Sequence, residues 1–229
     1  MPSKIEWLGK NGETWNPIVG CTKVGAGCAN CYAARLATMR AANPRTPQYH
    51  GIAEHGEWTG EVRFVPEQLD VPLHWRKPRS IFVCSMSDLF HPDVPDEWRH
   101  RIFDVMWATP QHRYIVLTKR IERAARYLAD VLVTSEYDHL WLGPSVWDQD
   151  SWDAAAPHVA ALKNAGWQTV VSAEPLLGPI DIMATYVGAT MHDPLGPNPF
   201  SYIDALVVGG ETGPGARPMH PDWARSLRD

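Results

Sequence analysis

The chain has 229 residues, of which 45% are hydrophobic, and a formal net charge of −5 at pH 7. This length suits one large domain, and the negative charge excludes a global attraction to nucleic acid, which would need a local basic patch. The amino-terminal residues lack the apolar stretch of a signal peptide, and no apolar run approaches the roughly 18 residues of a membrane span. We therefore expect a cytoplasmic protein without membrane segments.

The amino-terminal half predicts two strand–helix units separated by an irregular segment. The first strand is expected at Pro17–Gly20, and a cysteine-bearing loop leads from it to a helix over Ala29–Ala42. Residues 43–79 are rich in proline and do not fit a repeat, so we interpret them as an insertion at the rim of a sheet. A strand at Ile81–Cys84 follows, and apolar residues at helical spacing predict a helix over Asp96–Trp107.

The second half continues the alternation of strands and helices. Further strands are expected at Tyr114–Leu117, Leu140–Leu142, Thr169–Val171 and Ala205–Val208. Helices are expected at Ile121–Val133 and Ser151–Ala165. Residues 183–201 are a second rim insertion, and a short last helix from Pro221 to Asp229 predicts that the chain is a truncated version of a longer protein.

The spacing of these strands predicts the fold class. Their centres lie roughly 30 residues apart, the length of a strand–helix–strand unit. The strands are almost wholly apolar, as in a parallel sheet that is buried on both faces. We therefore predict one α/β domain over residues 1–229, a partial (β/α)6 TIM-like barrel with a parallel sheet.

Three cysteines within eleven residues are the main chemical signal. Cys21, Cys28 and Cys31 have the spacing C-x6-C-x2-C, and Cys84 is the fourth cysteine of the chain. An odd and tightly spaced set is not a disulfide framework, so a metal site with three protein ligands is expected. A structural zinc normally has four protein ligands, and no further Cys or His pair has suitable spacing, which favours an iron–sulfur site over zinc.

Polar residues follow every predicted strand. In parallel α/β folds, ligands bind beyond the carboxyl ends of the strands, so these residues are expected to meet at one mouth. The candidates are Ser87, Asp88, Lys119, Glu174, Gly209, Gly210 and Glu211. Simpler roles stay open: the carboxylates as caps of turns, Lys119 as a solvated charge at a helix start, and the glycines as sites of close backbone approach.

At these positions the chain resembles a phage-associated, radical-SAM-like family of unknown function with a three-cysteine motif. The resemblance rests on Asn30-Cys31-Tyr32-Ala33, Ser87-Asp88-Leu89-Phe90 and the segments at the other strand ends, and it covers nearly the whole chain. It implies a barrel of radical SAM type and a [4Fe–4S] cluster on Cys21, Cys28 and Cys31. The first gap of six residues, and an aromatic that follows the third cysteine rather than preceding it, depart from the usual pattern.

The resemblance also implies the cofactors and the type of reaction. S-adenosylmethionine would bind the fourth iron and be cleaved reductively to start radical chemistry, with electrons from a donor such as flavodoxin or ferredoxin. The implied cofactor contacts are Tyr32, Ser87, Asp88, Lys119, Glu174, Gly209, Gly210 and Glu211. Glu174 is the first choice for the ammonium group of the cofactor, and Lys119 for its carboxylate.

The substrate class implied is a modified base in phage DNA, which would place the protein in the host cytoplasm. Residues 74–77 (His-Trp-Arg-Lys), Tyr49 and Trp58 are candidate contacts to a nucleic-acid backbone and its bases, with an ordinary solvated loop as the alternative. Two other functions stay open: a non-catalytic iron–sulfur protein and a zinc-stabilised nucleic-acid-binding module.

Overall fold

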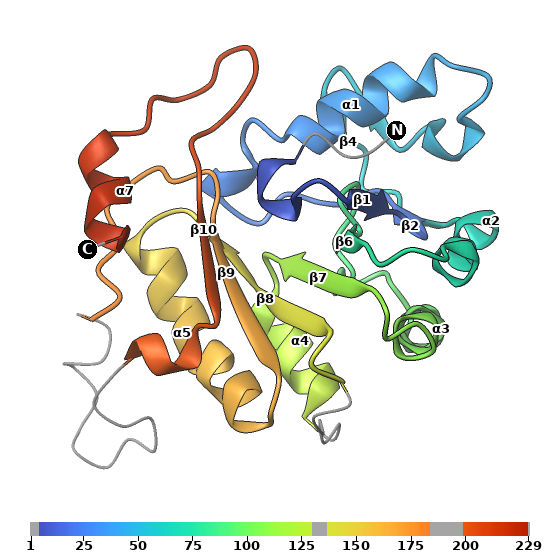
Figure 1. Ribbon diagram of the computed structural model, residues 1–229. Coiled ribbons are helices and arrows are strands. Elements are labelled where there is room, and N and C mark those ends of the chain that lie inside the picture. The colour runs from blue at the N-terminus through green and yellow to red at the C-terminus, as the bar shows by residue number, and fades with distance from the viewer. Residues whose placement is uncertain (1–4, 130–136, 184–198, 229) are drawn as a thin grey trace.

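The computed structural model describes residues 5–129, 137–183 and 199–228. Its centre is a six-stranded sheet in the order β1-β6-β7-β8-β9-β10, in which all neighbouring strands are parallel (Figure 1). The strands are β1 (Gly12–Trp15), β6 (Ser80–Val83), β7 (Arg113–Thr118), β8 (Leu140–Val146), β9 (Gln168–Ala173) and β10 (Ala205–Val208). The predicted parallel sheet of six strands is confirmed. It is open, because β1 and β10 are its edges and are not paired with each other.

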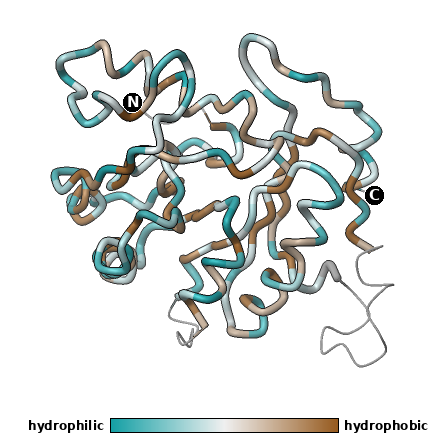
Figure 2. The backbone as a smooth tube through the Cα atoms, turned by 180° about the vertical axis from the view of Figure 1, so that it is seen from behind, coloured by the Kyte–Doolittle hydropathy of each residue, from teal (hydrophilic) through white to brown (hydrophobic). Residues whose placement is uncertain are grey.

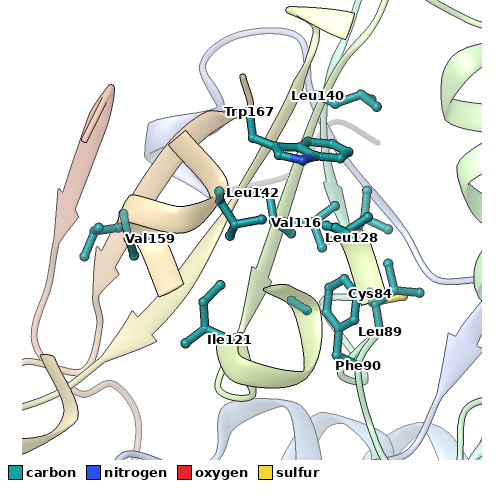
Figure 3. Packing of buried hydrophobic residues seen from close by; sticks show 14 of the residues in the cluster. Cys84, Leu89, Phe90, Val116, Ile121, Leu128, Leu140, Leu142, Val159 and Trp167 are labelled. Carbon is teal, nitrogen blue, oxygen red and sulfur yellow. The ribbon is translucent and has the colours of Figure 1, made fainter. Parts of the chain in front are cut away.

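One face of the sheet is covered by helices. The helices α3 (Asp96–Trp107), α4 (Ile121–Leu128) and α5 (Gln149–Asn164) connect successive strands from β6 to β9, and α7 (Pro221–Arg228) follows β10. Figure 3 shows how Val116 and Leu142 from the sheet pack with Leu128 and Val159 from the helices. Figure 2 shows the same layering, with hydrophobic segments in the strands and hydrophilic segments in the outer loops. No helix among the described residues has the length and apolarity to cross a bilayer.

The segment between β1 and β6 is irregular and lies beside the sheet. Its longest helix is α1 (Tyr32–Ala41), and the strands β2 (Ile18–Val19) and β5 (Arg63–Phe64) form an antiparallel pair. Its remaining elements are η2 (Ala26–Cys28), η3 (Pro47–Tyr49), β3 (Ala53–Glu54), β4 (Glu57–Trp58), α2 (Pro66–Leu69) and η4 (Val71–His74). Outside this segment, the short turns η1 (Glu6–Leu8) and η6 (Pro199–Tyr202) complete the described elements.

The opposite face of the sheet is covered by the amino-terminal residues. Leu8 clusters with Ile115 and Val170, and the Trp7 ring lies 5.4 Å from the ring of Phe82. This cover is a single turn of chain, so Phe82, Leu117 and Trp141, which surround this cluster, remain partly exposed. The sheet is therefore closed by helices on one side and only lightly covered on the other.

The prediction of the first strand was wrong. The edge strand is Gly12–Trp15, whereas Ile18–Val19 pairs with Arg63–Phe64 outside the main sheet. Pro17 has no N–H to donate and ends the edge strand. The strand Gly12–Trp15 is half polar and therefore lacks the apolar run that identifies the other five.

Helix boundaries differ at several ends. The helix predicted from Ala29 begins at Tyr32, because Ala26–Cys28 form a separate 3-10 turn. The helix predicted from Ser151 begins at Gln149, because the Asp148 side chain accepts from the Ser151 N–H and caps it. The end of the helix predicted to reach Val133, and nearly all of the insertion at 183–201, lie outside the described residues.

Candidate metal and cofactor site

A cavity of about 710 Å³ lies at the carboxyl ends of the strands. Its volume is in the range of small-molecule and cofactor sites. Ten of the eleven predicted site residues line it: Cys21, Cys28, Cys31, Tyr32, Ser87, Asp88, Lys119, Glu174, Gly210 and Glu211. The structure thus brings together residues that are separated by as many as 190 positions in the chain, as expected for the strand ends of one parallel sheet.

The cysteine loop, residues 20–31, rests on an aromatic ring. A Cβ atom at Gly25 would lie 2.5 Å from the indole of Trp147, and one at Gly27 would lie 2.6 Å from it. Real Cβ contacts are never this short, so any other residue at either position would push the loop away from β8. Trp147 directly follows β8, and its contact therefore sets the height of the loop above the strand ends.

The Cys21 thiol fits metal ligation better than it fits free thiol chemistry. Burial, with the Asp88 carboxylate nearby, raises the pKa of Cys21 to about 12. Such a thiol ionises at neutral pH only where a bound cation compensates its charge. Within residues 5–129, 137–183 and 199–228, no three Cys, His, Asp or Glu side chains converge on one metal ion.

Asp88 is buried and its carboxylate is fully engaged within the protein. One oxygen accepts from the Phe90 N–H at 2.9 Å and from the Thr118 hydroxyl at 2.7 Å. The other accepts from the Lys119 N–H at 3.2 Å and from Arg120 Nη1 at 3.0 Å. These four contacts give Asp88 a structural role in the segment after β6.

Glu211 has a similar set of partners at the other side of the loop. Its carboxylate accepts from the Asn30 amide at 2.8 Å and from the backbone and guanidinium of Arg217. The Arg217 hydrogen bonds lower the pKa of Glu211 to about 2. Arg217 also donates to the Ala26 carbonyl at 2.8 Å, so this ion pair ties the segment after β10 to the cysteine loop.

Glu174 and Lys119 are oppositely charged groups at the strand ends that remain open to the cavity. Burial raises the pKa of Glu174, although Ser172 and Trp7 donate to it and the Lys119 charge lies nearby. Within the described residues, the Lys119 ammonium makes no hydrogen bond or ion pair. Gly209 does not line the cavity but lies against the Glu174 carboxylate, where a Cβ atom would clash. A bound molecule that carries both an ammonium and a carboxylate group would therefore find an oppositely charged side chain for each, Glu174 and Lys119.

The other predicted contacts have specific local roles. The Tyr32 hydroxyl donates to the Ser85 carbonyl at 3.0 Å across the cavity, and the Ser87 hydroxyl donates to the Ile18 carbonyl at 2.9 Å. Cys84 belongs to the helix-covered core, beside Leu89 and Phe90 (Figure 3), and burial raises its pKa to about 12. It lies on a separate strand end from the cysteine loop.

The predicted nucleic-acid contacts are not brought together as one surface. Tyr49 is buried and accepts from Arg40, and Trp58 lines the cavity. Residues 74–77 precede β6 and so lie at the amino edge of the sheet, opposite the cavity. The rim insertion at 43–79 therefore spans both edges of the sheet.

Sequence reasoning missed several residues that hold the site. Arg120 stands in the polar segment after β7 and was visible as a strand-end cation. Trp147 also directly follows a strand, so a search for aromatic residues at strand ends could have found it. Arg217 and Trp7 carry no sequence signal, because their partners are distant and their positions follow no repeat.

A family model described as a protein of unknown function, DUF5131, matches residues 2–229. The chain belongs to the DUF5131 family. No curated protein matches it. Two solved structures of spore photoproduct lyase, one with a cysteine-to-serine and one with a cysteine-to-alanine substitution, share 12% identity with this DUF5131 chain. They give TM-scores of 0.46 and 0.45, cover 71% of this chain, and are themselves covered to 44% and 45%, so the chain spans less than half their length.

Proposed function

We propose that this DUF5131 protein is a radical SAM-like iron–sulfur enzyme that cleaves S-adenosylmethionine reductively. The observation that carries the proposal is the shared cavity. Three cysteines of one loop line it together with an open carboxylate, Glu174, and an open ammonium, Lys119. A [4Fe–4S] cluster with three protein ligands supplies, once reduced, the electron for this cleavage.

The residues of the chain would then have separate roles. Cys21, Cys28 and Cys31 would hold the cluster. Glu174 would bind the cofactor ammonium and Lys119 its carboxylate, since charge-assisted hydrogen bonds are strong in a partly buried cavity. Gly209 would keep space for the Glu174 carboxylate, which a side chain there would displace.

The wider parts of the proposal come from the family resemblance. An electron donor such as flavodoxin or ferredoxin would reduce the protein, and a modified base in phage DNA would be the substrate. The substrate is a separate prediction from the cleavage of S-adenosylmethionine, because the residues first considered for DNA contact lie at different edges of the sheet.

Anaerobic reconstitution tests the cluster. We expect about four irons per chain in the parent protein and in Cys84→Ala, and loss of the cluster in Cys21→Ala, Cys28→Ala or Cys31→Ala. Loss in Cys84→Ala with retention in Cys28→Ala would refute the ligand assignment. Tight binding of zinc without any iron cluster would favour the zinc-stabilised alternative.

Reductive formation of 5′-deoxyadenosine from S-adenosylmethionine then tests the enzyme. Calorimetry on reconstituted Glu174→Gln and Lys119→Met should show cofactor affinity weakened by about tenfold or more, the effect of losing one charge-assisted hydrogen bond. A cluster without 5′-deoxyadenosine would leave a non-catalytic iron–sulfur protein. Parent-like affinity in both variants would overturn the proposed binding site.

A further inference from the structure

Arg120 lies between a fixed carboxylate and the cysteine loop. Its side chain is 8% exposed and its Nη1 atom donates to Asp88 Oδ2 at 3.0 Å. Asp88 itself is held by the backbone of Phe90 and the hydroxyl of Thr118. The guanidinium is thus anchored, through Asp88, to the segments that follow β6 and β7.

From this anchor, Arg120 reaches the first cysteine and its neighbour. Nη1 lies 3.7 Å from Cys21 Sγ, a hydrogen-bond distance for sulfur, while Nη2 donates to the Thr22 carbonyl at 3.0 Å and to its hydroxyl at 2.8 Å. The Thr22 hydroxyl also contacts His91 Nε2 at 2.8 Å. Burial lowers the pKa of His91, and its Nδ1 atom accepts from the Asp93 N–H, so the neutral ring donates to Thr22 through Nε2.

This arrangement uses a property that only arginine has. The planar fork can serve two acceptors at each terminal nitrogen at fixed angles, whereas a lysine ammonium is a single point charge. The fork therefore fixes both the backbone at Thr22 and the position of the Cys21 sulfur. The contacts link strand ends to a loop that otherwise has little buried apolar surface.

A donor to a cluster-bound sulfur also has an electronic consequence. Hydrogen bonds to cysteine sulfurs set the reduction potential of iron–sulfur clusters. A reduced cluster carries one more negative charge than an oxidised one, so a hydrogen bond from Arg120 Nη1 to the Cys21 sulfur stabilises the reduced state more. The same Nη1 atom also donates to Asp88, whose carboxylate offsets part of the guanidinium charge, so the hydrogen bond rather than the net charge carries the effect.

We propose that Arg120 is a positioning residue that orients the Cys21 sulfur and raises the reduction potential of a cluster bound there. This inference rests on the proposed function for its electronic part. The orientation of Cys21 depends only on contacts within the chain and is separate from it.

The test uses Arg120→Lys, with Arg123→Lys as the matched control. Arg123 lies three residues further on, in the first turn of α4, and donates to the Phe90 carbonyl at 3.0 Å, without contact to a cysteine among the described residues. After reconstitution to equal iron content, the midpoint potential is measured by redox titration followed by electron paramagnetic resonance. At the parent midpoint, we expect the ratio of reduced to oxidised cluster in Arg120→Lys to fall about tenfold, equivalent to about 59 mV for one electron. Arg123→Lys should match the parent.

Hydrogen exchange on the metal-free proteins gives a second readout. The peptide that contains Cys21 and Thr22 should exchange faster in Arg120→Lys than in Arg123→Lys, because the tether to Thr22 is lost. An unchanged potential with an intact cluster would overturn the electronic part, and unchanged exchange would overturn the positioning part. If the parent forms no cluster, the proposed function and the electronic part both fail, while the exchange experiment still decides the positioning part.

Discussion

The cysteine loop and the helix-covered core belong to the same sheet but are stabilised in different ways. The core is a continuous apolar cluster from β6 to β9 and α3 to α5. The cysteine loop has two buried residues, both glycines (Gly20 and Gly27), and is held by side chains from Arg120 and Arg217, which are far away in the sequence. Apolar burial is cooperative across a domain, whereas each polar tether contributes about 1 kcal/mol. A change in the conformation of the loop therefore does not require the sheet to unfold.

The two tethers of the loop also differ from each other. Arg120 is 8% exposed and its partner Asp88 is 7% exposed, whereas Arg217 is 37% exposed and its partner Glu211 is 4% exposed. Breaking an ion pair in which both members are buried leaves an uncompensated charge in a low-dielectric site, but a pair with one partly exposed member is partly screened by water. We call the Arg120–Asp88 pair the inner tether and the Arg217–Glu211 pair the outer tether. Loss of the inner tether should thus lower the stability of the whole fold, whereas loss of the outer tether should affect only the loop.

Replacing Asp88 should have the largest effect. Asp88→Ala removes the counter-ion of Arg120 and four hydrogen bonds, so we expect the metal-free protein to lose about 3–5 kcal/mol of unfolding free energy in urea titrations. Asp104→Ala, an exposed carboxylate on α3, is the control and should stay within about 0.5 kcal/mol of the parent. A loss of unfolding free energy below about 1 kcal/mol in Asp88→Ala would show that water screens the Asp88–Arg120 pair as it screens an exposed pair.

The apolar core should respond globally and leave the site intact. Leu142 is 1% exposed in the core cluster, so Leu142→Ala should cost about 3 kcal/mol through lost burial and a cavity. Because Leu142 does not line the cavity, reconstituted Leu142→Ala should keep the iron content of the parent below its unfolding transition. Loss of iron by the folded variant would contradict the independence of the two regions.

The contact between Gly27 and Trp147 joins the two regions. Gly27→Ala places a Cβ atom 2.6 Å from the indole, and overpacking of this kind costs about 1–3 kcal/mol. A double-mutant cycle with Trp147→Ala measures the coupling, since the added methyl should be tolerated once the ring is gone. Additive effects of the two substitutions would exclude this contact as the support of the loop.

The two regions also differ in how far the sequence predicts them. The five apolar strands and the helix Asp96–Trp107 were predicted closely, because buried parallel strands have one simple pattern. The edge strand Gly12–Trp15 was missed because an edge position tolerates polar residues and leaves no apolar run. Local patterns thus predict the core well and its edges poorly.

Within the site, residue types were predictable but their partners were not. The cysteine spacing and the strand-end positions of Glu174 and Lys119 identified residues that line one cavity. The pairing of Asp88 with Arg120 and of Glu211 with Arg217 depends on distances between segments far apart in the chain. A carboxylate at a strand end has the same sequence signal whether it binds a ligand or an arginine.

The outer tether should give a smaller, local effect. Arg217→Ala removes the guanidinium donor to Glu211 and to the Ala26 carbonyl. We expect a loss of about 1 kcal/mol, because Arg217 is 37% exposed and the Asn30 amide and the backbone N–H of residue 217 still donate to Glu211. The peptide around Ala26 should exchange hydrogen faster in the variant. Arg225→Ala, which breaks an exposed pair with Asp222 on α7, is the control and should leave that peptide unchanged.

The pH dependence of the outer tether should be the smallest effect. The Arg217 hydrogen bonds lower the pKa of Glu211 from 4.5 to about 2, so between these values the unfolded chain binds more protons than the folded one. The stability contributed by the pair is therefore complete above about pH 4.5 and is lost as the pH falls towards about 2. Since Arg217 is 37% exposed, solvent screening keeps the change at about 1 kcal/mol or less. Urea titrations of the parent and of Glu211→Gln should give a constant difference above about pH 5 that shrinks as the pH falls towards 2. A difference that is the same at both ends of this range would mean that the Glu211 charge contributes nothing, and that the outer tether holds the loop through its neutral hydrogen bonds alone.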